Sequence, residues 1–177
     1  MSPTLPPCGL YRTGRALRLP EGEIPEGALV MFHNHSDRGT PMLQLPKENT
    51  HNVWTFHDEG PGIEEEAFLA ALQPLRPQGF YFLNGDLQTP DGSYPAHTLV
   101  QLGYNRDGDP ILFPAQRRHD QNLLFFSDRG YRFSGPDIFQ NLSPEEPLLF
   151  SEYRGPSQPK SSPPPVKSKG PKGGIYH

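Results

Sequence analysis

The sequence predicts a mainly β protein made of two tandem copies of one small β-barrel. The segment that begins at Gly9 recurs without a gap from Gly79, and 15 of the 67 positions from Gly9 to Leu75 are identical to the aligned position of the second copy. We call the shift from Gly9 to Gly79 the repeat offset. Only 33% of residues are hydrophobic, whereas 23 prolines and 18 glycines supply many turns. Short aromatic and aliphatic runs recur between those turns, as expected for short strands.

The repeat divides the chain into four segments. We expect a Pro-rich lead at residues 1–8, a first repeat at 9–78, a second repeat at 79–153 and a tail at 154–177. Units of this size are only marginally stable alone. The tail is rich in Pro, Ser, Gly and Lys, which bury too little surface to offset the entropy of ordering, so we expect it to be flexible.

The elements follow the same order in each repeat. Aromatic and apolar content predicts strands in pairs, at 10–13 and 80–83, 28–33 and 98–103, 42–45 and 111–113, and 53–56 and 123–126. A long turn-rich loop separates the first two strands of each copy, with Pro-Glu-Gly in one and Pro-Asp-Gly in the other. A short helix then ends each copy, at 64–72 and, as a single turn, at 136–142.

Each copy also needs a closing strand, because open sheet edges invite aggregation. We expect the strand that opens the second repeat to close the first, and residues 147–153 to close the second. This order of strand, long loop, three-strand meander, helical turn and closing strand is similar to that of SH3-like small barrels. The acidic loop and tandem tryptophans of that family are absent here, so the resemblance implies no proline-peptide groove.

Cysteine content and hydropathy place the chain among cytoplasmic proteins. Its one cysteine, Cys8, cannot form a disulfide within the chain. No apolar run approaches the ~20 residues of a membrane helix, and the first residues lack the basic and apolar blocks of a signal peptide.

Charge is unevenly distributed along the chain. Residues 1–152 carry a net charge of −9 and residues 153–177 a net charge of +5. The acidic body is a poor candidate for nucleic-acid binding and suits a protein partner with a basic surface. The basic tail leaves nucleic-acid binding as an alternative, with an affinity that would fall steeply as salt rises.

Aromatic side chains on or beside the long loops are the candidate partner-binding residues. Small barrels often bind partners near their rims, so we predict this role for Tyr11, Tyr81, Tyr94 and Tyr104, together with the tail residues Ile175 and Tyr176. Trp54 lies in an apolar strand and is interpreted as a core residue.

Histidines provide the one candidate metal site. His33 and His35 lie two apart on a predicted strand and so share a face, and His51 and His57 follow. With a further ligand such as Asp37 or His97, they would suit Zn or Fe. Gly27 followed by His33-x-His35 resembles the opening of the cupin metal motif, although the glutamate that motif requires is missing here.

The second repeat does not contain this histidine pattern. Gly103, Asn105, Gln121 and Ser127 stand at the aligned positions, so the simpler interpretation is a set of polar surface histidines. No His or basic partner for Cys8 is evident from the sequence. Two recurring glycines, Gly60 and Gly130, each stand two positions after an aspartate, and we expect turns in which glycine takes a positive φ. No catalytic residue is predicted.

These observations favour a non-enzymatic protein-interaction module, such as an adaptor, an assembly subunit or an immunity-type inhibitor of a basic toxin. A metal-dependent enzyme centred on His33 and His35 is the alternative, and nucleic-acid binding through the tail is a second one. No cofactor is expected except Zn or Fe in the metal alternative.

Overall fold

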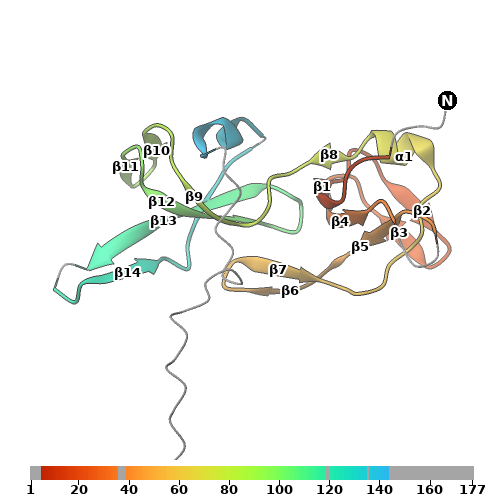
Figure 1. The fold of residues 1–177 in the computed structure, drawn as a ribbon, viewed down its shortest axis with the longest axis horizontal. Coiled ribbons are helices and arrows are strands. Elements are labelled where there is room, and N and C mark those ends of the chain that lie inside the picture. Colours follow the sequence, from red (N-terminus) through yellow and green to blue (C-terminus); the bar gives the residue numbers. More distant parts are fainter. Residues whose placement is uncertain (1–4, 36–38, 119, 135, 144–177) are drawn as a thin grey trace, which may run out of the picture.

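The computed structural model describes residues 5–35, 39–118, 120–134 and 136–143. These residues form a mainly β fold of short strands, with one short α-helix and one 3₁₀-helix. The molecule is elongated, with a first half (residues 9–78) at one end and a second half (residues 79–143) at the other (Figure 1). The predicted closing segment 147–153 and the tail 154–177 lie outside the described residues.

Antiparallel pairings build a four-stranded sheet in the first half. Its order is β5 (Met42–Gln44), β4 (Leu29–His33), β1 (Gly9–Arg12) and β8 (Gln73–Pro74). Two hairpins accompany it, formed by β2 (Leu17–Leu19) with β3 (Gly22–Ile24) and by β6 (Pro46–Thr50) with β7 (Val53–Phe56). The helix α1 (Glu66–Ala70) precedes β8.

The second half has a corresponding sheet. Its order is β14 (Leu123–Phe126), β13 (Pro110–Arg118), β12 (Leu99–Tyr104) and β9 (Gly79–Phe82), and β15 (Tyr131–Arg132) also pairs with β13. The strands β10 (Leu87–Thr89) and β11 (Gly92–Tyr94) form a hairpin, and the 3₁₀-helix η1 (Pro136–Asn141) follows β15.

Strand register is the same in the central pairs of the two halves. Gly9 is opposite Phe32 where β1 meets β4, and Gly79 is opposite Leu102 where β9 meets β12, so both partners are shifted by the repeat offset. We call two residues counterparts when they hold the same place in the pairing of the two halves. By this definition Arg12, opposite Leu29, is the counterpart of Phe82, opposite Leu99.

The shift changes after β4 and is then restored. Phe32 is opposite Leu43, and its counterpart Leu102 is opposite Leu112, so the shift between these strands is shorter than the repeat offset by one. A bulge between Pro46 and Glu48 removes one more. The β6–β7 turn encloses two residues and the β13–β14 turn four, which returns β7 and β14 to the repeat offset. An ungapped alignment hides these changes because they cancel.

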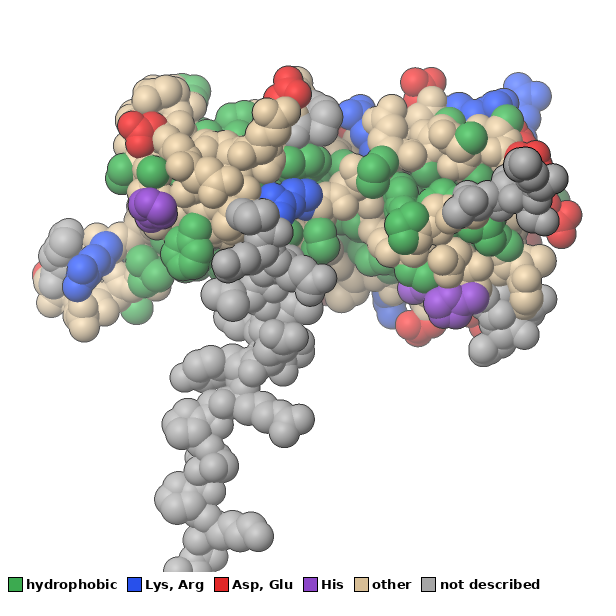
Figure 2. Space-filling model, turned by 45° about the horizontal axis from the view of Figure 1, so that its top comes forward, with side chains coloured by type: hydrophobic (Ala, Val, Ile, Leu, Met, Phe, Trp, Pro, Cys, Tyr) green, Lys and Arg blue, Asp and Glu red, His purple; other side chains and the backbone are tan. Residues whose placement is uncertain are grey.

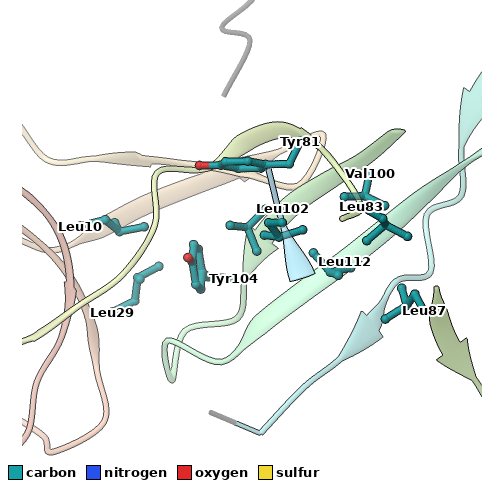
Figure 3. Packing of buried hydrophobic residues seen from close by; sticks show 10 residues of the cluster. Leu10, Leu29, Tyr81, Leu83, Leu87, Val100, Leu102, Tyr104 and Leu112 are labelled. Carbon is teal, nitrogen blue, oxygen red and sulfur yellow. The ribbon is translucent and has the colours of Figure 1, made fainter. Parts of the chain in front are cut away.

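Buried hydrophobic residues of the described chain form two clusters. One consists of first-half residues such as Phe32, Leu43 and Phe68. The other is the core of the second half and also contains Leu10 and Leu29 of the first half. Figure 3 shows these two leucines on the side of the cluster where Tyr104 lies. The core of the second half therefore extends onto the sheet of the first.

Several predicted elements need correction. The turn-rich loops contain the hairpins β2–β3 and β10–β11, and β6 was missed because Lys47, Glu48 and Asn49 give it no apolar pattern. The predicted helix 64–72 forms only over Glu66–Ala70. The strand β9 pairs with β12 and does not close the first sheet, because β8 already occupies the free edge of β1. The sheets are open within the described residues, so the closed barrels stay a prediction.

The prediction of a positive φ at the two recurring glycines was also wrong. Neither Gly60 nor Gly130 is among the described glycines with positive φ. A Cβ on Gly60 would overlap the carbonyl of Leu43, and one on Gly130 would lie 2.5 Å from Ile111 Cγ2. Close approach of the backbone to a neighbouring strand, not φ, explains glycine at both positions.

No helix in the described part of the chain is long and apolar enough to span a bilayer.

Candidate protein-binding surface

The outer face of the first-half sheet is covered by the second half. We define this outer face as the side that faces away from the half's own core, with Leu10, Arg12, Leu29, Met31, Trp54 and Phe56. Leu10 and Leu29 are buried, and Met31, Trp54 and Phe56 pack against the core of the second half. The cover is the β12–β13 turn of the second half, residues 104–109.

Specific polar contacts hold this turn in place. Leu29 N donates to Arg106 O at 2.9 Å, and Trp54 Nε1 donates to Tyr104 O at 2.7 Å. The Arg106 guanidinium lies 5.4 Å from the centre of the Trp54 ring. At the edge, Arg12 Nη1 lies 3.4 Å from Asp109 Oδ1. The indole and the two guanidinium groups therefore fix one turn on one sheet face.

The tip of the β6–β7 hairpin reaches in turn onto β12. Gln101 Nε2 donates to His51 O at 2.7 Å, and Asn52 Nδ2 donates to Gln101 Oε1 at 3.3 Å. A Cβ on Gly103 would lie 2.6 Å from Asn52 O, so the approach depends on glycine. Both His51 and Asn52 have positive φ, as a tight two-residue hairpin turn requires.

Arg76 of the first half forms a further set of contacts with the second half. Its guanidinium donates to Phe139 O, Leu142 O and Ser143 O, the last at 2.7 Å, and lies 4.8 Å from the centre of the Tyr81 ring. Arg76 O accepts the Tyr104 hydroxyl at 2.8 Å. Burial raises the pKa of Tyr104, so the phenol stays protonated as a donor.

The outer face of the second half lacks such a cover in the described part of the chain. By register, Phe80, Phe82, Leu124 and Phe126 point to the same side of this sheet. Phe82 is 44% exposed and Leu124 53% exposed, and the rings of Phe80 and Phe126 are 5.2 Å apart. Figure 2 shows hydrophobic side chains at the surface of the β13–β14 arm, which projects to the left. This largely apolar face, on which Arg117 lies opposite Leu124, is the candidate protein-binding surface.

Its two most exposed members have informative counterparts. Phe82 is the counterpart of Arg12, and Leu124 is the counterpart of Trp54. Arg12 and Trp54 both hold the covering turn on the first half. The positions that make the internal contact in one half are therefore the exposed apolar positions of the other.

The tyrosines predicted to bind a partner are mostly internal. Tyr11, Tyr81 and Tyr104 are buried, and each hydroxyl donates to a backbone carbonyl. Tyr94 is half-buried, and its hydrogen bond with the Tyr131 hydroxyl raises the pKa of Tyr94 to about 12. Ile175 and Tyr176 lie outside the described residues. The role predicted for these residues stays a prediction, and the surface described above includes none of them.

The four histidines of the predicted metal site lie in different settings. His33 Nε2 is 3.0 Å from Gln44 Oε1, and His35 Nδ1 is 2.7 Å from Asn34 Oδ1. His51 lies at the hairpin tip, and His57 lines a hollow at the junction of the halves. Asp37 lies outside the described residues, and His97 has a positive φ in the second half. No group of three metal-ligating side chains forms among the residues described.

Cys8 has neighbours that the sequence did not indicate. Its thiol donates to Asn34 Oδ1 at 3.1 Å and lies 3.7 Å from His35 Nδ1, and Cys8 and His35 are both exposed. The antiparallel pairing of β1 with β4 explains this proximity. It places Cys8, which precedes β1, beside Asn34 and His35, which follow β4.

Acidic side chains line a shallow hollow of about 610 Å³ on the first half. Glu21, Glu23 and Glu59 lie around Leu19 and Leu45. A neighbouring hollow of about 340 Å³ shares Glu23 and Leu45 and adds Glu26, Asp107, Arg106 and His57. Sequence reasoning predicted an acidic body but not this grouping, because the loops that meet here lie far apart in the chain.

Comparison with protein-family models, curated proteins and solved structures gave no match. Function must therefore be inferred from the surfaces of the molecule itself.

Proposed function

We propose that this protein is a non-enzymatic, cytoplasmic protein-interaction module built from a duplicated small β unit related to SH3-like barrels. The duplication is supported by the shared register of the central strands and by the return to the repeat offset at β14. The barrel relationship is supported by the shared order of strand, hairpin, meander, helical turn and short closing pairing. Adaptor, assembly subunit and immunity-type inhibitor all remain within this proposal.

The apolar outer face of the second half carries the proposal. Phe82 and Leu124 are large, exposed and adjacent to Phe80 and Phe126 on one sheet face. Contiguous apolar surface of this kind marks sites of protein association on soluble proteins. In the first half, the corresponding face binds the turn at residues 104–109 of the same chain. The equivalent face of the second half is therefore suited to binding a protein segment as well.

The edge of the same sheet supports association too. Among the described residues β14 is the last strand in its sheet, and its residues Leu123-Leu124-Phe125-Phe126 carry no charge. Natural edge strands are usually protected by charges, prolines or bulges against pairing with another chain. An uncharged apolar edge strand suits pairing with a partner.

The acid-lined hollows favour a partner that also has basic groups. Glu21, Glu23 and Glu59 surround an apolar floor that includes Leu19 and Leu45. Lysine and arginine side chains can place their apolar stems on such a floor and their charges near the carboxylates.

Affinity capture with the full chain as bait tests the proposal. We expect a partner to be retained by the wild-type protein and lost with Leu124→Asp, because a charge would be desolvated at the centre of the contact. Leu5→Asp is the matched control, since Leu5 is also exposed and lines neither of the acidic hollows. The captured protein must then bind the purified chain directly, with the same dependence on Leu124.

A set of captured proteins that is identical for wild type and Leu124→Asp would contradict this proposal. A catalytic activity of the purified chain that survives both substitutions, without any partner, would also contradict it.

A further inference from the structure

We propose that the larger acid-lined hollow of the first half binds the basic C-terminal tail, residues 154–177, of the same molecule. This inference rests on the part of the proposed function that gives the acid-lined hollows a basic ligand, and it names that ligand. The apolar face of the second half plays no part in it. Three observations lead to the inference: the chemistry of the hollow, the different chemistry of the corresponding place in the second half, and the charge and reach of the tail.

The hollow combines apolar walls with carboxylates that lack a cation. Apolar side chains and three glutamates line its volume of about 610 Å³, and none of the lining residues is basic. Glu23 Oε2 lies 3.7 Å from Arg18 Nε. Glu21 and Glu59, which are both exposed, form no ion pair with another described residue. Two carboxylates are therefore available to an incoming cation.

The corresponding place in the second half has larger side chains. By strand pairing, Tyr94 is the counterpart of Ile24, which lines the hollow. Arg132 is the counterpart of Gly62, and Tyr131 precedes it. The Tyr94 and Tyr131 rings are 5.9 Å apart, and their hydroxyl oxygens are 3.2 Å apart. Side chains that the first half lacks thus join the hairpin to the sheet at this place.

The charge at the corresponding place differs as well. At the repeat offset, the three glutamates of the hollow are replaced by Asp91, Ser93 and Arg129. With Arg132, that place carries one carboxylate and two guanidinium groups, which would not attract a basic segment. The open, acidic hollow is therefore not a consequence of the backbone that the halves share. It results from side chains specific to the first half.

The tail has the complementary charge. Residues 154–177 contain no acidic residue, and their five basic residues are Arg154, Lys160, Lys167, Lys169 and Lys172. Lysine can place its apolar stem on Leu19 and Leu45 and its ammonium group near the carboxylates. A single exposed ion pair is weak, but a segment tethered to its site binds at a high effective concentration. Charge and tethering together favour the tail of the same molecule over a free basic peptide.

The tail is also long enough to reach the hollow. Ser143, the last described residue, lies at the junction of the halves, where its carbonyl accepts from Arg76 Nη2 at 2.7 Å. Lys160 comes 17 residues later, and an extended chain spans up to ~3.3 Å per residue, or ~55 Å in all. A unit of about 70 residues has a radius of gyration of about 11 Å. The tail can therefore reach any part of the surface of the first half.

A docked tail would regulate access to the hollow. A basic partner could bind there only after displacing the tail. Its apparent affinity would fall in proportion to the fraction of molecules in which the hollow is empty. The tail would thus select partners that bind the hollow more strongly than it does.

Paramagnetic relaxation measured by NMR on the full chain tests the inference. In a Cys8→Ser background, Ser168→Cys carries a nitroxide between two tail lysines. The amide signals of the hollow's glycines, Gly22, Gly60 and Gly62, should lose intensity and recover it when the nitroxide is reduced. The loss should diminish as salt rises to about 1 M, where the Debye length is about 3 Å.

Removal of charge from the hollow identifies the site. Glu21→Gln together with Glu59→Gln should lower the equilibrium constant for docking by about threefold to tenfold, as for two exposed ion pairs. Glu48→Gln together with Glu66→Gln is the matched control. Both of these glutamates are exposed on the first half and line neither acidic hollow, so this pair should leave the intensity loss unchanged.

Three outcomes would overturn the inference. Equal effects of the two double substitutions would show a general attraction of the tail to the acidic body. No intensity loss at the glycines of the hollow would show that the tail does not dock there. Equal loss in a mixture of nitroxide-labelled chains with separate isotope-labelled chains would assign the ligand to the tail of another copy. None of these outcomes affects the proposed function, which capture and its dependence on Leu124 test separately.

Discussion

Gly103 lies beneath the tip of the β6–β7 hairpin, where the absence of a side chain lets the two halves touch. Glycine in a strand interior normally weakens the strand relative to alanine. Here the nearest group to a Cβ added at this position would be the backbone oxygen of Asn52, at 2.6 Å, followed by Phe113 Cε2 at 3.4 Å. The carbonyl belongs to a tight turn and cannot rotate away as a side chain could.

Gly103→Ala should therefore destabilise the protein, by about 1–3 kcal/mol as for other overpacked sites. Gly9→Ala is the control, because a Cβ there would make only an ordinary contact of 3.7 Å with Tyr11. Its effect should stay within about 0.5 kcal/mol. Urea unfolding followed by circular dichroism measures both, and equal effects of the two substitutions would refute the close-contact explanation.

The β6–β7 and β13–β14 hairpins hold equivalent places in the two halves but make different contacts. In the first half, the β6–β7 hairpin has a two-residue turn and carries Trp54, which donates to Tyr104 O. In the second half, the β13–β14 hairpin has a four-residue turn and carries the exposed Leu124. The first holds the molecule together, and the second is free within the described residues to bind outside it.

Exchanging the two side chains tests this division of roles. Trp54→Leu should lower the free energy of unfolding by about 1–3 kcal/mol, because it removes an indole donor from a buried carbonyl and the contact with the Arg106 guanidinium. Leu124→Trp should change it by less than about 0.5 kcal/mol at an exposed site. Both are measured by urea unfolding at one protein concentration. A larger loss from Leu124→Trp than from Trp54→Leu would contradict these roles.

Across the whole molecule, buried tyrosines link stability to alkaline pH. Burial, then the charge of Cys8, raises the pKa of Tyr11, and burial raises the pKa of Tyr104. The hydrogen bond to Tyr131 raises the pKa of Tyr94 to about 12. The unfolded value is near 10. The folded state therefore holds these protons more tightly, and the resulting stability is complete below pH ~10 and is lost as pH rises through the folded values.

Tyr104→Phe should make this loss shallower. Each such group contributes at most about 1.4 kcal/mol per pH unit to the slope, and the variant lacks one of them. Urea unfolding on both sides of pH ~10 measures the slope. Trp54→Leu is the control, because it weakens the same junction but retains Tyr104 and should keep the wild-type slope. Identical slopes for wild type and Tyr104→Phe would rule out this contribution.

Much of the fold could be predicted from local pattern. The strands at 53–56 and 123–126 form with the predicted bounds, because the β preference of aromatic and large apolar side chains acts over a few residues. The candidate site was less accessible. Leu124 lies in an apolar run that looks like any core strand, and only its lack of a covering turn makes it a surface residue.

The burial of three tyrosines also could not be predicted from the local sequence. Tyr11, Tyr81 and Tyr104 flank turn-rich segments and were predicted to face a partner, yet each is buried with its hydroxyl bonded to a backbone carbonyl. Aromatic rings with a polar tip suit both a core and a rim. Their setting depends on which distant segment packs against them.

By itself, the sequence determined that this chain is mainly β, with aromatic and apolar runs that recur at the repeat offset and an acidic body, because these follow from residue type and short-range pattern. Only the tertiary structure decided that the outer face of one half is covered while the same face of the other is open in the described residues. The physical reason is that coverage depends on contacts between segments distant in the chain, such as Trp54 with Tyr104, which no local pattern encodes.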